Sequence, residues 1–180
     1  MTKKGLNTIE GVKVFKRPVF NSNLGVFSET YRKEWFKNEF IQDSISLSKK
    51  KGTIRGMHLQ NGKYSQAKLV TVLKGSIKDI FIDLRKDSDT FCDYGSLKIS
   101  EDNNKALLLP RGFAHGFITL EPNTIVSYKM DNNYSPTNEI TIKWDDPSLS
   151  ISWPKKITYT LSDKDKIGIS LKDYLLINKF

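Results

Sequence analysis

The feature that most restricts the fold is a two-residue alternation of apolar and polar side chains, interrupted by Gly, Asn, Asp and Pro. Residues 69–73 (LVTVL) lead through Lys74-Gly75-Ser76 into residues 77–84 (IKDIFIDL). Alternation with β-branched residues is typical of strands, and a glycine between two such runs is typical of a tight turn. We therefore expect residues 69–73 and 77–84 to form two strands joined by a tight glycine turn.

The same pattern recurs along the chain at short, regular intervals. Further strands are expected at residues 94–100, 105–109, 116–120, 125–130 and 140–144. Helical patterns are scarce, with one turn expected at residues 29–33 and an amphipathic segment at residues 171–179. Many short strands separated by turns indicate a sandwich or a barrel. The predicted fold class is all-β, with a few short helices.

The length of 180 residues is enough for one domain with a hydrophobic core. No repeat, low-complexity tract or Pro/Ser-rich linker divides the chain, so residues 1–180 are expected to form a single domain. The longest apolar stretches, such as residues 106–109, are far too short for a membrane span, and no apolar run of a signal peptide follows Met1. The one cysteine, Cys92, fits a reducing compartment. We expect a cytoplasmic protein.

The formal charge of +9 and a pI near 9.5 raise the question of an anionic partner. Basic proteins bind nucleic acid, anionic membrane surfaces or phosphorylated small molecules. The lysines are scattered, and the one run, residues 49–51, precedes Gly52 as a solvated turn would. No recognition-helix pattern, zinc knuckle or Arg-rich arm accompanies it, so neither nucleic acid nor a membrane is the expected partner. A diphosphate-bearing ligand would account for part of the charge.

Several polar side chains occupy positions at which the alternation predicts core residues. These are Arg55, His58, Gln60, Lys68, His115 and Tyr128. Such groups are costly to bury unless they contact one another or a ligand. In a small barrel with a ligand in its mouth, they would line a polar pocket.

Seven motifs, all in the same order, carry a resemblance to a known family. They are residues 55–58 (RGMH), 66–70 (QAKLV), 83–85 (DLR), 110–117 (PRGFAHGF), 144–147 (WDDP), 151–154 (ISWP) and 161–165 (LSDKD). Over roughly residues 12–166 the chain resembles the dTDP-4-dehydrorhamnose 3,5-epimerase family of cupin-like jelly-roll barrels. The resemblance implies an isomerase of bacterial surface polysaccharide biosynthesis. It would invert C3, or C3 and C5, of a nucleotide-linked 4-keto sugar and would need no metal or redox cofactor.

This chemistry requires particular residue types. Removing a proton from a carbon beside a ketone gives an enolate, so the enzyme needs a base, a positive group at the oxyanion and an acid on the opposite face. The resemblance implies that His58 is the base, oriented by Asp165. It implies that Lys68 lies beside the C4 oxygen and that Tyr128 is the acid.

The resemblance also implies substrate contacts outside the reacting atoms. Arg55 and His115 correspond to pocket residues that would hold sugar hydroxyls or phosphate. Gln60 and Tyr134 are further candidate substrate-binding residues. Glycines 56, 112 and 116 are expected where turns or close packing require them.

Simpler interpretations remain open beside these roles. A structural hydrogen bond is as good an explanation of His115 as a ligand contact is. Tyr128 could be a core tyrosine with a satisfied hydroxyl, and Tyr134 competes with it for the acid role. Asp163 could replace Asp165 as the carboxylate partner of the histidine base.

Two segments depart from the family pattern. Residues 21–29 (NSNLGVFSE) carry Leu24 where the family commonly has an arginine that reaches the nucleotide diphosphate across a dimer interface. Residues 42–46 (QDSIS) lack the Asn-His pair that the family often has before the serine. The lost guanidinium removes a bidentate phosphate contact. GDP-, dTDP- and CDP-linked 4-keto sugars, including 4-keto-heptoses, therefore all remain candidate substrates.

The resemblance further implies a homodimer, because family members exchange N-terminal strands. Residues 19–32 would then complete the nucleotide site of the partner, with Phe27 or Glu29 contacting the base.

Other functions are weighed against this one. Metal-binding cupins use a His-x-His pair with a third histidine and a carboxylate, and a chain with two histidines and no such pair is not expected to bind metal. A 3,4-ketoisomerase would use similar chemistry. A non-catalytic sugar-binding cupin would be favoured if His58, Lys68 and Tyr128 did not converge on one cavity. A nucleic-acid-binding barrel rests on the charge alone.

Overall fold

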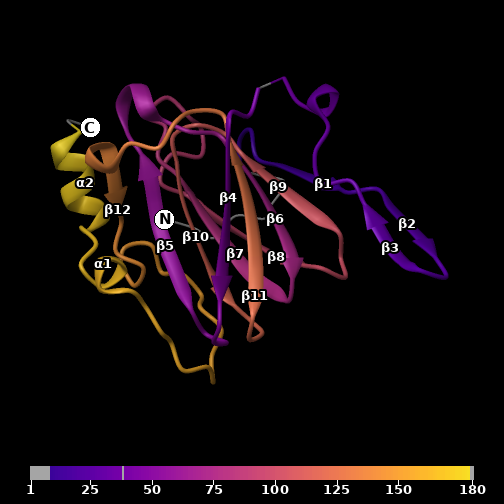
Figure 1. The fold of residues 1–180 in the computed structure, drawn as a ribbon. Coiled ribbons are helices and arrows are strands. Elements are labelled where there is room, and N and C mark those ends of the chain that lie inside the picture. Colours follow the sequence, from indigo (N-terminus) through magenta and orange to yellow (C-terminus); the bar gives the residue numbers. More distant parts are fainter. Residues whose placement is uncertain (1–8, 38, 179–180) are drawn as a thin grey trace.

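The computed structural model describes residues 9–37 and 39–178, which fold into two antiparallel sheets packed face to face (Figure 1). Sheet I has the order β1 (Lys13–Lys16), β9 (Lys105–Leu109), β6 (Lys68–Lys74), β11 (Thr124–Met130) and β4 (Gln42–Ser48). Sheet II has the order β12 (Glu139–Thr141), β5 (Ile54–Gln60), β10 (Phe113–Thr119), β7 (Ser76–Asp83) and β8 (Tyr94–Ser100). The predicted all-β, cupin-like jelly-roll barrel is confirmed.

The two strands and the glycine turn that the alternation predicts are present as β6 and β7. They belong to different sheets, so the turn connects sheet I to sheet II. Gly75 occupies this turn with a φ of +76°, a conformation that glycine adopts without strain. A Cβ atom there would lie 2.5 Å from the Thr124 hydroxyl oxygen at the start of β11. The glycine therefore serves both the turn and the close approach of β11.

The core has two layers because both faces of sheet II are covered. Between the sheets pack Val70 and Val72 of β6, Phe81 of β7 and Phe117 of β10, with further apolar residues of β8, β9 and β11. On the outer face of sheet II pack Met57, Leu59, Ile80, Ile82 and Ala114. Strand β10 has no exposed position, because both of its faces are covered. A strand buried on both faces has no need for alternating polar residues.

The C-terminal segment supplies the cover of the outer face. It runs through α1 (Asp163–Lys166) and α2 (Leu171–Ile177), whose Leu171 and Tyr174 join the outer core layer. Ser162 and Ser170 cap the two helices by accepting hydrogen bonds from backbone N–H groups. Within the described ranges, no helix is long and apolar enough to cross a membrane.

A hairpin projects away from the barrel beside β1 and β9 (Figure 1). It is formed by β2 (Val19–Ser22) and β3 (Gly25–Ser28). Its exposed apolar side chains are Phe20, Leu24, Val26 and Phe27. Several exposed apolar side chains on a projecting segment are typical of a surface that docks on another chain.

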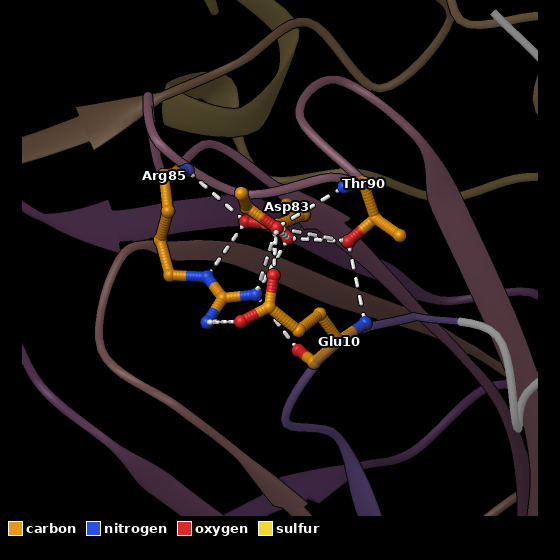
Figure 2. Close-up of polar contacts among 5 residues, drawn as sticks. Glu10, Asp83, Arg85 and Thr90 are labelled. Carbon is orange, nitrogen blue, oxygen red and sulfur yellow. Dashed lines mark hydrogen bonds and ion pairs between the residues drawn. The ribbon is translucent and has the colours of Figure 1, made fainter.

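Figure 2 shows a buried polar cluster at the end of β7. Asp83, which is fully buried, accepts hydrogen bonds from Arg85 Nη2 at 2.7 Å and from the hydroxyls of Ser88 and Thr90 at 2.6 Å each. Arg85 also donates to the carbonyl of Glu10 at 2.7 Å. Burial opposes ionisation, but these hydrogen bonds keep the pKa of Asp83 below its usual value. The cluster thus joins β7, the following loop and the segment before β1.

Some sequence predictions differ from the structure. The helical turn expected at residues 29–33 is wrong, since the 3-10 helix η2 begins only at Lys33 and ends at Trp35. The strand expected at residues 140–144 is the shorter β12, and the helix expected at 171–179 is confirmed up to Ile177, whereas residue 179 lies outside the described residues.

Five strands and three short helices were not anticipated: β1, β2, β3, β4, β5, α1, η3 (Gly62–Tyr64) and η4 (Pro136–Asn138). Strands β4 and β5 were missed because their inward positions lack the apolar residues that mark a strand in the sequence. Their inward positions carry serines, Arg55 and His58 in place of apolar residues, because these strands face a polar cavity.

Candidate active site

A cavity of about 370 Å³ opens between sheets I and II. It is lined by side chains of both sheets: Gln42, Ser44, Ser46, Arg55, His58, Leu59, Gln60, Gln66, Lys68, His115, Phe117, Tyr128, Met130, Tyr134 and Glu139. All six polar residues that the sequence places in a core-like context line this one cavity. The predicted polar pocket is therefore present in the barrel.

An irregularity in β5 brings Arg55 and His58 to the same face. Side chains three residues apart on a regular strand point to opposite faces. Here the pairing of β5 with β10 shifts register, so that His58 lies opposite His115 while Arg55 lies opposite Phe117. Gly56 makes the shift possible, since its φ is +127° and a Cβ atom there would lie 2.5 Å from the backbone of β10.

His58 is hydrogen-bonded to a buried carboxylate. Its Nε2 atom lies 2.5 Å from Asp165 Oδ1, and the other oxygen of Asp165 accepts from the Ser162 hydroxyl at 2.8 Å. Burial opposes ionisation, but these hydrogen bonds hold the pKa of Asp165 below its usual value. A carboxylate can only accept, so Nε2 carries a proton, and in the neutral ring the lone pair is on Nδ1, on the side away from Asp165. Asp163, the alternative partner, is exposed and pairs with Lys166 instead.

Lys68 reaches the cavity from the opposite sheet. It begins β6, and its Nζ atom lies 3.5 Å from the carbonyl oxygen of His58. Burial lowers the pKa of Lys68 to about 8, although the carboxylates of Glu139 and Asp79 act in the other direction. Its ammonium group is therefore poorly solvated and available to an anionic atom in the cavity.

Tyr128 also enters from sheet I, on β11. Its hydroxyl lies 3.1 Å from the Ser46 hydroxyl of β4. Burial raises the pKa of Tyr128, so the phenol is neutral and keeps its proton at ordinary pH. Because His58 belongs to sheet II, the histidine and this tyrosine approach the cavity from opposite sheets.

His115 is both a structural residue and a cavity residue. Its Nε2 atom lies 2.8 Å from Asp79 Oδ2 in the buried interior, and its ring lines the cavity. Burial raises the pKa of Asp79, while His115 opposes that shift. The structural hydrogen bond expected of His115 is therefore present, and its ring also lies where it could contact a ligand.

Glu139 is a site residue that the sequence prediction missed. It begins β12 and lies opposite Gln60, so its side chain enters the cavity on the same strand face as His58 does. Its Oε2 atom accepts a 2.6 Å hydrogen bond from the Tyr134 hydroxyl, which raises the pKa of Tyr134 to about 12. The predicted strand began at residue 140 and so left Glu139 out. A strand that begins at residue 139 places the Glu139 side chain on the face that lines the cavity.

Asp79 and Ser46 were also missed. An aspartate within the apolar run of residues 77–84 was a usable signal, because a buried carboxylate requires a partner. For Ser46 we find no comparable signal.

Two other predicted substrate-binding side chains form hydrogen bonds within the protein. Gln60 accepts a 2.9 Å hydrogen bond from the backbone N–H of Ser135, and Arg55 donates to the Ser48 hydroxyl at 3.2 Å. Both side chains nevertheless line the cavity.

The structure does not bring the predicted nucleotide contacts Phe27 and Glu29 into this cavity. Phe27 is exposed on the projecting hairpin, and Glu29 pairs with Arg32. Leu24, which replaces the family arginine, is 93% exposed at the hairpin tip. Of the two changed positions on β4, Ser44 lines the cavity and Ile45 faces outward.

Among residues 9–37 and 39–178, no three His, Cys, Asp or Glu side chains lie close enough together to hold a metal ion.

Comparisons with known proteins agree with this architecture. The sequence model of the family described as dTDP-4-dehydrorhamnose 3,5-epimerase matches residues 7–173. An enzyme of that name from Sinorhizobium fredii is 40% identical over 169 residues, which cover 91% of this chain and 87% of the relative. The epimerase structure from Bacillus anthracis, with TDP and PPi bound, has a TM-score of 0.86 and 42% identity, covering 89% of this chain and 94% of that one. A 3,5-epimerase from Legionella pneumophila in complex with dTDP-4-keto-L-rhamnose has a TM-score of 0.87 and 33% identity, covering 92% and 90%.

The barrel and its sequence relatives define the class of this protein: it is an isomerase, an epimerase of nucleotide-linked 4-keto sugars. Within that class, the chain belongs to the dTDP-4-dehydrorhamnose 3,5-epimerase family.

Proposed function

We propose that His58 is the base of this epimerase and removes the proton from C3, or in turn from C3 and C5, of the 4-keto sugar. The free Nδ1 atom accepts the proton, and the bond electrons move to the C4 oxygen to give an enolate. Asp165 fixes the tautomer through Nε2 and stabilises the imidazolium that forms. The 2.5 Å contact between His58 and Asp165 supports this role.

Lys68 and Tyr128 complete the proposed reaction. The buried ammonium of Lys68 stabilises the enolate oxygen, an effect that is large in a site shielded from water. Tyr128 then donates its proton to the carbon from the opposite face, which inverts the configuration. Its position on the sheet facing His58, and its raised pKa, support the acid role.

The observation that carries the proposal is the convergence of His58, Lys68 and Tyr128 on one cavity. A sugar-binding barrel without activity has no need for a histidine–carboxylate pair, a poorly solvated lysine and a neutral phenol around the same space. Arg55, Gln60 and His115 line the cavity beside them, where they are proposed to hold sugar hydroxyls or phosphate.

The nucleotide is the least constrained part of the substrate. Leu24 cannot make the phosphate contact of an arginine, so we propose that GDP- or CDP-linked 4-keto sugars are substrates as well as dTDP-linked ones. The test is solvent deuterium incorporation, followed by NMR, into a panel of these three donors. We expect exchange at C3, or at C3 and C5, with at least one donor.

The matched control is the same donor reduced at C4, whose C3 proton is no longer acidified and should not exchange. Exchange of no ketone in the panel would contradict the proposed function. Tight, selective binding of dTDP over GDP and CDP would contradict the broader nucleotide range.

We further propose a homodimer in which residues 19–32 complete the nucleotide site of the partner. The hairpin of β2 and β3 exposes Phe20, Val26 and Phe27, and an outward face of β4 exposes Ile45 and Leu47. Gel filtration with light scattering at micromolar concentration should give about twice the 20.6 kDa chain mass. A clean monomer would contradict the proposal.

Lys68 should determine how the exchange rate depends on pH on the alkaline side. The lowered pKa of Lys68 means that the ammonium is present below about pH 8 and is lost as the pH rises through that value. If the ammonium stabilises the enolate, the exchange rate should fall above about pH 8. The rate of Lys68→Met should be low throughout and should lack this decline. A wild-type rate that stays constant to pH 10 would contradict the role.

We place the reaction in the cytoplasm, in the synthesis of a bacterial surface polysaccharide. The free thiol of Cys92 is buried, and burial raises its pKa to about 11, which is consistent with an unreactive residue in a reducing compartment.

A further inference from the structure

A second carboxylate borders His58 on the side away from Asp165. Glu139 lies at the start of β12, opposite Gln60 and therefore one strand over from His58. Its Oε1 atom is 4.0 Å from His58 Nδ1. The imidazole thus lies between two carboxylates, with Nε2 bonded to Asp165 and Nδ1 facing Glu139.

The other oxygen of Glu139 is fixed by two partners. Tyr134 donates a hydrogen bond to Oε2 at 2.6 Å, and Lys164 forms an ion pair with the same atom. Only 12% of the Glu139 side chain is exposed. Lys164 directly precedes Asp165 on α1, so one short helix supplies both the partner of the histidine and the lysine that neutralises Glu139.

We propose that Glu139 is a positioning residue which, balanced by Lys164, sets the basicity of His58; this inference rests on the proposed role of His58 as the base. A negative charge near Nδ1 stabilises the imidazolium that forms when the proton arrives. At 4.0 Å the two atoms do not form a direct hydrogen bond, so the effect acts through space. The Lys164 ammonium weakens it, because it lies against the same carboxylate.

Glu139 is ionised in this arrangement. Burial opposes its ionisation, but the ion pair with Lys164 and the hydrogen bond from Tyr134 keep the pKa of Glu139 below its usual value. Its charge is therefore present throughout the pH range in which a histidine titrates.

Several elements bring charged or titratable groups to the cavity that His58 lines, and the test must separate Glu139 from the others. They are Asp165 and Lys164 from α1, Glu139 from β12, Arg55 from β5, Lys68 from β6, His115 from β10, Tyr128 from β11 and Tyr134 from the loop after β11. Glu139 and Lys164 are distinguished from the rest by their opposite signs, which predict opposite effects on His58.

The experiment is an NMR titration of the imidazole signals, which is simple because the chain has two histidines. The His58→Asn variant assigns them. Glu139→Gln should move the His58 titration curve to lower pH by about half a unit or more, and Lys164→Met should move it to higher pH. Lys166→Met is the matched control, since it removes a lysine of the same helix that pairs with exposed Asp163, and it should leave the curve unchanged.

A His58 curve that stays in place in both variants, or that moves in the same direction in both, would overturn the inference. If Glu139→Gln does not fold, the direction of the Lys164→Met shift decides alone. The titration needs no substrate, so it is independent of the proposed function. With an active substrate, the acid limb of kcat/KM should follow the NMR curve. If the His58 titration curve shifts as expected but the wild type exchanges deuterium into no donor, the base role of His58 is contradicted. The electrostatic effect of Glu139 on His58 is then still supported.

Discussion

The His58→Asn variant should lose at least about 1,000-fold of the exchange rate at C3, within the range that a general base contributes. Asparagine has no lone pair of comparable basicity at the Nδ1 position, so the first proton transfer has no acceptor. The fold should persist, because Asp165 keeps its hydrogen bond with Ser162 and the ring of His58 belongs to the cavity wall rather than to either core layer.

The measurement is deuterium incorporation under single-turnover conditions, with thermal unfolding as the check on folding. Asp165→Asn should fall between the wild type and His58→Asn, since the base remains but its orientation and its imidazolium are less well supported. Exchange by His58→Asn within 10-fold of the wild type would assign the base to another residue.

Replacing Asp83 with alanine should destabilise the fold by about 3–4 kcal/mol. The change removes the acceptor of Arg85, Ser88 and Thr90 and leaves a partly buried guanidinium without its carboxylate (Figure 2). For a chain of this length, the melting temperature should fall by about 10 °C. The free energy of unfolding, measured by urea titration at pH 7, gives the value directly.

The exposed Asp87, in the same loop, provides the matched control, and its alanine variant should change stability by less than about 0.5 kcal/mol. The pH dependence gives a second check on Asp83. Its pKa is lowered by folding, so its contribution is present above about pH 4 and is lost as the pH falls through the folded value. The difference between the wild type and Asp83→Ala should therefore shrink in acid. An equal loss in both alanine variants at pH 7 would contradict the argument.

The sequence predicted the apolar strands of this fold better than its polar ones. Strands such as those at residues 69–73 and 77–84 can be predicted from the local sequence, because alternation and a glycine turn reflect local backbone geometry. Strand β4 was missed since it faces the cavity with Ser44 and Ser46, which have no apolar signal. The hairpin of β2 and β3 was missed as a pair of strands because its apolar residues are exposed and do not belong to a core of this chain.

Site residues could be predicted from the sequence where their type is unusual for the surrounding pattern. Lys68 within an apolar strand and the motif around His58 both pointed to the cavity that the structure contains. Glu139 could not be found in this way, because glutamate is an ordinary residue at a strand end. Its neighbours Tyr134 and Lys164 become neighbours only through the tertiary fold.

The covering of sheet II by the C-terminal segment has a further consequence for how this enzyme becomes competent. His58 and Asp165 are 107 positions apart, yet they are hydrogen-bonded, and Asp165 lies on the segment that covers the outer core layer. The C-terminal segment therefore both covers the outer core layer and places Asp165 against His58. A barrel without this segment in place would lack the carboxylate that holds the His58 ring.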